Sequence, residues 1–176
     1  MKLFTTICVI LSLLLMNCSD GEKKMDIDRL LESRDINNSI IELDNYITEL
    51  CNYGENMEKL TDAQKIFYIN QNLEREVNNG GFNQYFYNSS GDFAHETVDA
   101  LKTIGAIKTA SILQAAIDQF PNKIVPKERD KRINILEQIE GKSDSIWEDL
   151  DQQFFKYEED LNQLNIEFVR QHKENF

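Results

Sequence analysis

The segment from His95 to Asp99, His-Glu-Thr-Val-Asp, has the spacing of an incomplete zinc motif. His95 and Asp99 are four residues apart, so on a helix both side chains would lie on one face and could share a metal ion. A zinc site needs a further ligand and a general base, and the other histidine, His172, lies near the C-terminus. The alternative is a surface histidine in the first turns of a helix, among acids that suit the helix dipole. We expect no metal site.

Other catalytic signatures are missing from the sequence. It contains no G-x-S-x-G segment, no P-loop, no dinucleotide-binding fingerprint and no Cys–His pairing. Cys51 closes an apolar helical pattern, which is typical of a buried, inert thiol rather than a nucleophile. Pairs of carboxylates are frequent, but chance pairs are expected in a chain with 31 acidic residues. We therefore expect neither catalysis nor a cofactor.

Carboxylates recur at helical spacing in two places. The two sets are Asp92, Glu96 and Asp99, and Asp144, Glu148 and Asp151, with Glu158 seven residues further on. Successive carboxylates in such a stripe rise ~4.5–6 Å along a helix, which is comparable to DNA phosphates one to two steps apart at ~3.4 Å per step. Two interpretations remain open: a solvated helix face, or a surface that binds a basic partner.

The net charge of −12 argues against direct binding to nucleic acid, because an acidic surface repels phosphates. It favours a basic protein partner or simply solubility. The charge is also uneven. Residues 121–134 contain five basic and two acidic side chains, whereas residues 135–167 contain ten acidic and two basic ones.

The elements that position these side chains all show helical periodicity, and no segment alternates as a strand does. We predict an all-α fold, a compact single-domain bundle of about six to eight helices without a sheet. Capping boxes predict helix starts at Ser39, Thr61 and Ser145. Gly141 predicts the end of a helix over 127–140. Ile146, Leu150 and Phe154 are expected to face inward, in a region 142–176 that forms one long helix or two.

Glycines and aromatic residues gather in residues 76–93, which we interpret as a packed corner. Gly80 and Gly81 end one helix, because glycine adopts the backbone angles that such an end requires. The spacing of Phe82, Tyr85 and Phe86 buries them together, and Ser89, Ser90 or Asp92 would cap the next helix. In the alternative interpretation the corner is a partner groove, with exposed polar groups from Asn79, Gln84, Tyr87 and Asn88.

The first residues predict a signal peptide over 1–17. Lys2 precedes an apolar run over 3–16 that would be ~21 Å long as a helix, too short for a ~30 Å hydrocarbon core. The segment around Cys18 resembles the lipobox of bacterial lipoproteins, although Met16 and Asn17 replace its usual small residues. We predict lipid attachment at Cys18, a polar tether over 18–26 and an acidic helical domain over 27–176. The expected location is the cell envelope, or the cytoplasm if the leader is not processed.

The central segment EVNNGGFNQYFYNSSGDFAHETVDALKTIGA, residues 76–106, resembles the signature of a family of small, acidic, helical bacterial proteins named after a DNA mimic protein. The flanking LTDAQKIFYIN and WEDLDQQFFKYEEDL agree with the same layout, so the resemblance extends over roughly residues 40–173. It implies an all-α fold without catalysis, in which carboxylates take the place of DNA phosphates toward a DNA-binding protein. It assigns no acidic position individually.

Two functional hypotheses follow. The first is a non-enzymatic acidic module that binds a basic partner, for example a DNA-binding protein. The second is a lipid-anchored envelope protein that serves as a scaffold or neutralises a toxin, without DNA mimicry.

Overall fold

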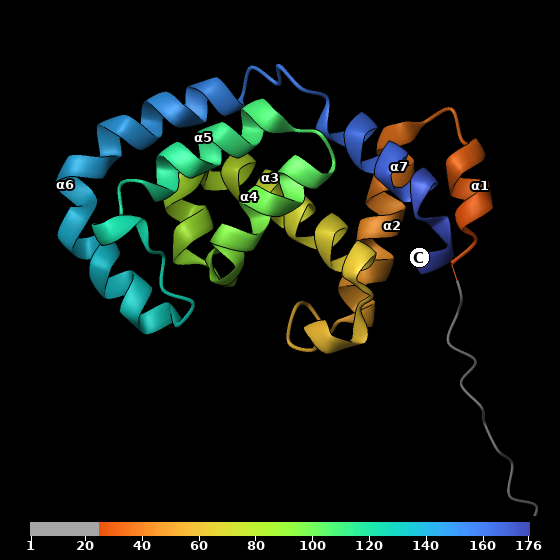
Figure 1. Ribbon diagram of the computed structural model, residues 1–176, viewed down its shortest axis with the longest axis horizontal. Helices are drawn as coiled ribbons and strands as arrows, with labels where there is room; N and C mark the ends of the chain where they lie inside the picture. The colour runs from red at the N-terminus through yellow and green to blue at the C-terminus, as the bar shows by residue number, and fades with distance from the viewer. Residues whose placement is uncertain (1–24) are drawn as a thin grey trace, which may run out of the picture.

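The computed structural model describes residues 25–176, in which all regular secondary structure is helical and no strand is present (Figure 1). The prediction of an all-α fold with six to eight helices is confirmed. The α-helices are α1 (Ile27–Glu32), α2 (Ile36–Leu50), α3 (Asp62–Tyr87), α4 (Ala94–Thr103), α5 (Ile107–Ile117), α6 (Arg129–Phe154) and α7 (Leu161–Gln171). The short 3₁₀-helices are η1 (Met57–Lys59), η2 (Ser89–Phe93), η3 (Pro121–Lys123) and η4 (Lys173–Asn175).

Two hydrophobic clusters hold these helices together, and α3 contributes to both. One cluster joins α1, α2 and α7 to the first half of α3 through residues such as Phe67 and Ile69. The other joins α4, α5 and α6 to the second half of α3, which includes Val77 and Phe82. In Figure 1, α3 crosses the middle of the molecule, with α6 at one end and α1, α2 and α7 at the other.

The capping box predicted at Thr61 is confirmed. Its hydroxyl accepts a hydrogen bond from the Gln64 backbone N–H at 3.1 Å, and its own N–H donates to Gln64 Oε1 at 3.0 Å. These reciprocal bonds satisfy backbone donors that the first helical turn leaves free, so α3 begins here.

The helix start predicted at Ser39 is wrong. α2 begins at Ile36, and Asp35 caps it by accepting from the Asn38 N–H at 3.0 Å. Ser39 lies inside the helix and is buried, and its hydroxyl donates to the Leu30 carbonyl at 3.1 Å. An earlier residue with a strong capping side chain therefore took the role.

The predicted helix end at Gly141 and the helix start at Ser145 are both wrong, because α6 continues through them. The helix keeps one face on the core on both sides of the glycine, with Leu136, Trp147, Leu150 and Phe154 buried. Trp147 takes the inward position that was expected for Ile146, which is 40% exposed. The real break in 142–176 follows Phe154, and α7 begins after its N-cap Asp160.

The described residues contain no helix with the length and apolar character needed to cross a membrane. The predicted signal peptide over 1–17 and Cys18 lie outside the residues that the structure describes.

Candidate partner-binding site

The glycine corner sets the position of the second half of α3 against α6. Gly80 and Gly81 depart from helical geometry, and Gly81 has a φ of +70°, which favours glycine. The Phe82 N–H that the corner frees donates to Asp151 Oδ1 on α6 at 2.9 Å. A Cβ atom at Gly81 would lie 2.1 Å from the other oxygen of Asp151, so only glycine fits there. The packed-corner interpretation is confirmed, since Phe82, Tyr85 and Phe86 are fully buried.

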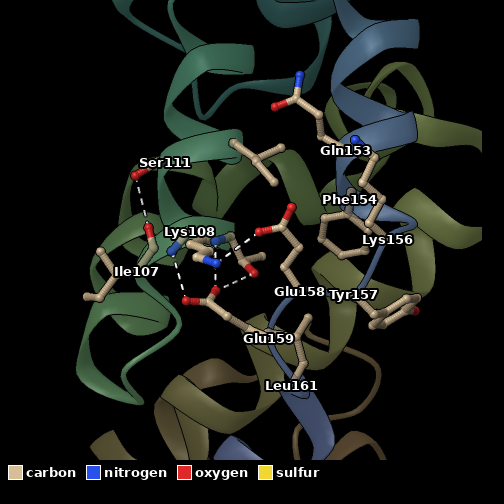
Figure 2. Close-up of a pocket in the computed structure, with 12 residues that line it drawn as sticks. Ile107, Lys108, Ser111, Gln153, Phe154, Lys156, Tyr157, Glu158, Glu159 and Leu161 are labelled. Carbon is tan, nitrogen blue, oxygen red and sulfur yellow. Dashed lines mark hydrogen bonds and ion pairs between the residues drawn. The ribbon is translucent and has the colours of Figure 1, made fainter.

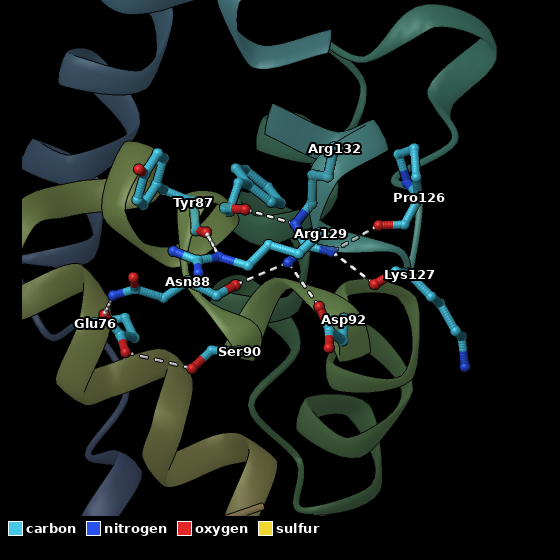
Figure 3. Close-up of polar contacts among 10 residues, drawn as sticks. Glu76, Tyr87, Asn88, Ser90, Asp92, Pro126, Lys127, Arg129 and Arg132 are labelled. Atoms are coloured by element: carbon cyan, nitrogen blue, oxygen red, sulfur yellow. Dashed lines mark hydrogen bonds and ion pairs between the residues drawn. The ribbon is translucent and has the colours of Figure 1, made fainter. Parts of the chain in front are cut away.

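Arg132 fastens the first turns of α6 to the end of α3 (Figure 3). Its side chain has no exposed surface. It donates to the backbone carbonyls of Phe86, Asn88, Pro126 and Lys127 at 2.6–3.0 Å and to the carboxylate of Asp92 at 2.6 Å. A buried guanidinium with all its donors paired in this way is a positioning element, because an unpaired one would cost several kcal/mol.

The predicted stripe Asp92, Glu96 and Asp99 is largely neutralised within the molecule. Asp92 lies in η2 rather than on α4, and its partner is Arg132 rather than a helix end, so the predicted cap is not formed. Glu96 pairs with Lys127, and Asp99 lies 3.5 Å from Lys102. Partial burial opposes the charge on Glu96, but the hydrogen bond from Lys127 outweighs it and lowers the pKa of this carboxyl.

The second predicted stripe lies on α6 and is longer than predicted. Because α6 continues through Gly141, Asp144 and Glu148 share a helix face with two carboxylates that the sequence analysis missed, Glu137 and Glu140. We call these four residues the α6 acidic face. At 100° per residue they lie within about 80° of one another around the helix. All four are exposed, and none forms an ion pair with another residue in 25–176.

Two other members of that predicted stripe have different roles. Asp151 is on the same helix, but its carboxylate accepts from Phe82 at the glycine corner. Burial and the charge of Glu148 raise the pKa of Asp151, although the hydrogen bond opposes the shift. Glu158 is not on α6 at all, because the helix ends at Phe154, and its carboxylate pairs with Lys108 at 2.9 Å.

Of the four residues proposed to form a groove, one meets the α6 acidic face. Gln84 and Asn88 each donate to Glu76 Oε2 at 2.8 Å, so their amides bind within the corner, as Figure 3 shows for Asn88. Asn79 is exposed beside the glycines. Tyr87 is 48% exposed and lines a hollow against α6.

That α3–α6 hollow has a volume of about 170 Å³. Its lining residues are Asn83 and Tyr87 from α3 and Ile133, Leu136, Glu137, Glu140, Asp144 and Trp147 from α6. The Trp147 indole N–H donates to the Ala116 carbonyl at 3.1 Å, so this floor residue has no free polar group. The hollow therefore combines an apolar floor, one half-exposed aromatic ring and three carboxylates of the α6 acidic face.

A second hollow of about 560 Å³ lies between α5 and the segment that joins α6 to α7 (Figure 2). Its carboxylates are already engaged. Glu159 accepts from the backbone N–H groups of Lys108 and Thr109 and from the Thr109 hydroxyl, each at 2.9 Å, and so caps α5. Glu158 pairs with Lys108. This arrangement locks the connection to α5.

His95 makes a structural contact. Its Nε2 accepts from the Val125 N–H at 3.1 Å, which ties α4 to the segment before α6. Within residues 25–176 no group of three or more His, Cys, Asp and Glu side chains lies close enough to hold a metal ion. Cys51 is fully buried, as its helical pattern predicted.

The helical fold and the α6 carboxylates that form no ion pair in residues 25–176 define a small, acidic, all-α protein. A family model described as DMP19-like protein matches residues 58–172, so the chain belongs to the DMP19-like family, as its central motif predicted. No curated protein and no solved structure matches the chain. The matched region contains α3, α4, α5 and α6 completely, and therefore the whole α6 acidic face.

Proposed function

We propose that this protein is a non-enzymatic binding module whose α6 acidic face takes the place of nucleic-acid phosphates toward a basic partner, for example a DNA-binding protein. The observation that carries the proposal is the row Glu137, Glu140, Asp144 and Glu148, all exposed and without ion pairs in the described chain. Membership in the DMP19-like family supports it. Direct nucleic-acid binding is not part of the proposal, since the net charge of −12 opposes it.

The spacing of the row suits a polyanion mimic. Its members are separated by three, four and four residues, which corresponds to steps of ~4.5–6 Å and a total length of ~16 Å along the helix. A DNA strand spans the same length in about five phosphate steps of ~3.4 Å. A partner that reads phosphates by charge would therefore meet about two-thirds as many negative groups as one DNA strand presents over the same length.

Most basic side chains near the start of α6 are paired elsewhere and do not offset the charge of the α6 acidic face. Basic side chains near the start of α6 are mostly paired: Lys131 with Glu128, Lys127 with Glu96, and Arg132 with Asp92. The lysine nearest in sequence to the α6 acidic face is Lys142, which follows Glu140 by two residues. Its side chain therefore points to another side of the helix, about 160° from that of Glu140. The uneven charge of the sequence thus becomes one exposed acidic face, without an equivalent free basic face on α6.

The proposal is tested with fluorescently labelled octalysine as the probe and the full-length chain. The variant Glu137→Gln, Glu140→Gln, Asp144→Asn and Glu148→Gln is compared with a control in which Glu32, Glu49, Glu58 and Glu174 are changed to Gln. The control residues are also exposed and free of ion pairs in the described chain, so both variants lose the same charge.

Wild type should bind octalysine in a salt-sensitive manner, and the α6 variant should bind it at least about fivefold more weakly, since exposed ion pairs contribute ~0.2–1 kcal/mol each. The control should stay close to wild type. Equal losses in both variants would show that net charge, and not the α6 acidic face, determines binding, and would contradict the proposal.

We also propose that Cys18 carries a lipid anchor that places the protein in the cell envelope, as the lipobox-like leader suggests. Labelled acyl chains should be incorporated into wild type and not into Cys18→Ala. Recovery of the unprocessed wild-type chain from the cytosol would contradict this location.

A further inference from the structure

The α3–α6 hollow has the dimensions and lining of a site for one planar cationic side chain. Its volume of about 170 Å³ corresponds to roughly six water molecules at ~30 Å³ each. Pockets for drug-sized ligands and cofactors are larger, at ~300–1,000 Å³. The hollow is therefore small for a drug-sized ligand or cofactor, and a single side chain of a partner suits it.

The lining selects the chemistry of that side chain. One wall of the hollow carries the carboxylates of Glu137, Glu140 and Asp144. None of the three forms an ion pair in the described chain. Tyr87 offers an aromatic ring that is 48% exposed, and Leu136 and Trp147 form an apolar floor. A guanidinium suits all of these at once, because it is planar, stacks on aromatic rings, donates two parallel hydrogen bonds to a carboxylate and is weakly hydrated. A lysine ammonium is compact and strongly hydrated, so it gains less from the ring and the floor.

The molecule already contains one contact of this kind. The Arg129 guanidinium lies over the Tyr87 ring, 5.0 Å from its centroid, and Arg129 Nε donates to the Tyr87 carbonyl at 3.0 Å. Figure 3 shows this arginine beside Tyr87 at the end of α3. This contact is independent of the carboxylates. Arg129 does not line the hollow, whereas Tyr87 does, so the part of the ring that faces the hollow is left for a second guanidinium.

We propose that the α3–α6 hollow binds an arginine side chain of the basic partner and so gives the α6 acidic face a preference for arginine over lysine. The inference rests on the proposed function, since it concerns the same surface. Charge complementarity brings a basic segment to the row of carboxylates, and Tyr87 with the apolar floor distinguishes between the two kinds of cation.

The test compares labelled octaarginine and octalysine, which carry equal charge, on the full-length chain at matched ionic strength. Wild type should bind octaarginine about two- to fivefold more tightly, the range expected for an exposed cation–aromatic contact. Tyr87→Leu should remove that preference, because it weakens octaarginine binding more than octalysine binding. Tyr53→Leu is the matched control, since Tyr53 is 74% exposed and does not line the hollow.

The outcomes separate this inference from the proposed function. If wild type binds both peptides equally, and the charge-neutralised α6 variant binds neither well, the arginine site is wrong and the acidic binding module stands. If wild type binds neither peptide, both are wrong. A preference for octaarginine that persists in Tyr87→Leu would also overturn the site. Circular dichroism of Tyr87→Leu confirms that the variant is folded, and its backbone carbonyl remains available to Arg129.

Discussion

Arg132 is the only charged residue that is buried in the described chain. A guanidinium without exposed surface needs a partner for each donor, and four backbone carbonyls and Asp92 supply them. Gly91 leaves the space for it, since a Cβ atom there would lie 2.8 Å from Arg132 Nε. The contacts join the end of α3 to the beginning of α6, and so they set the two walls of the α3–α6 hollow.

We expect Arg132→Met to lower the free energy of unfolding by about 3–5 kcal/mol, because it strands the carbonyls and Asp92 without their donor. Urea unfolding followed by circular dichroism measures the loss. Arg34→Met is the matched control, since Arg34 is exposed and forms no ion pair in the described chain. Equal stability of the two variants would contradict the positioning role of Arg132.

The ionisation of Glu159 should make the free energy of unfolding depend on pH. Partial burial opposes its charge, but the N–H groups of Lys108 and Thr109 outweigh this and lower the pKa of Glu159. The unfolded chain, with an ordinary glutamate pKa of ~4.3, therefore holds the proton more tightly than the folded chain. The stability that Glu159 contributes is complete above the ordinary pKa and is lost as the pH falls through the lowered one.

Glu159→Gln should therefore be less stable than wild type by about 1 kcal/mol near neutral pH, the usual cost of losing a helix cap. The difference should shrink as the pH falls below about 4. Urea unfolding at several pH values provides the measurement, with Glu174→Gln as the control for loss of one exposed carboxylate that forms no ion pair in the described chain. A difference that does not change with pH would show that ionisation of Glu159 is unimportant.

At the scale of the elements, Gly81 in α3 and Gly141 in α6 differ in whether the structure requires glycine. Gly81 has a φ of +70° and leaves room for Asp151, so its role is steric. Gly141 lies in the middle of α6, and a Cβ atom there would meet nothing within 4 Å. No contact in the described residues requires glycine at position 141.

We predict that Gly141→Ala stabilises the protein by about 0.5–1 kcal/mol, because alanine loses less entropy in a helix. Gly81→Ala should destabilise it by more than that, through the positive φ and the overlap with Asp151. Thermal unfolding of the two variants in parallel provides the comparison. Destabilisation by Gly141→Ala would mean that α6 needs a local distortion at this point.

These helices also show what the sequence could predict. Helical periodicity identified the fold class, and the glycines and aromatics of 76–93 identified the corner, since both depend on local spacing. The extent of α6 could not be found in the same way. Gly141 and the Ser145 capping pattern both favour a break locally, but burial of Trp147 and Leu150 against the core outweighs them. For that reason the predicted stripe began at Asp144 and did not include Glu137 and Glu140.

Two predicted site carboxylates pair with residues of other elements. Asp92 and Glu158 bind Arg132 and Lys108, which lie 40 and 50 residues away in the chain. Spacing within one helix carries no information about such partners. A sequence therefore shows where carboxylates line up, and only the packing of the helices shows which of them remain free.

At the scale of the whole molecule, two hydrophobic clusters share one long helix. Ile66 and Phe176 pack against both clusters, and α3 runs through them. A shared central helix couples the two, because neither cluster can lose its part of α3 without exposing residues of the other.

We predict that residues 25–176 unfold in a single cooperative transition. Trp147 is the only tryptophan of the chain and reports on the cluster around α6. Circular dichroism at 222 nm reports on all the helices. The urea midpoints from tryptophan fluorescence and from circular dichroism should coincide. Separate midpoints would show that the cluster around α2 unfolds on its own.

The two ends of the described chain meet at one pole of the molecule, where Lys173 pairs with Asp28 at 2.9 Å. Figure 1 shows α6 at the opposite pole. A molecule held at either end, on a bead, a sensor surface or a bilayer, presents α6 outward, at the greatest distance from the support. Both ends of the described chain thus lie away from α6, and we expect a tag at either terminus to leave this helix accessible.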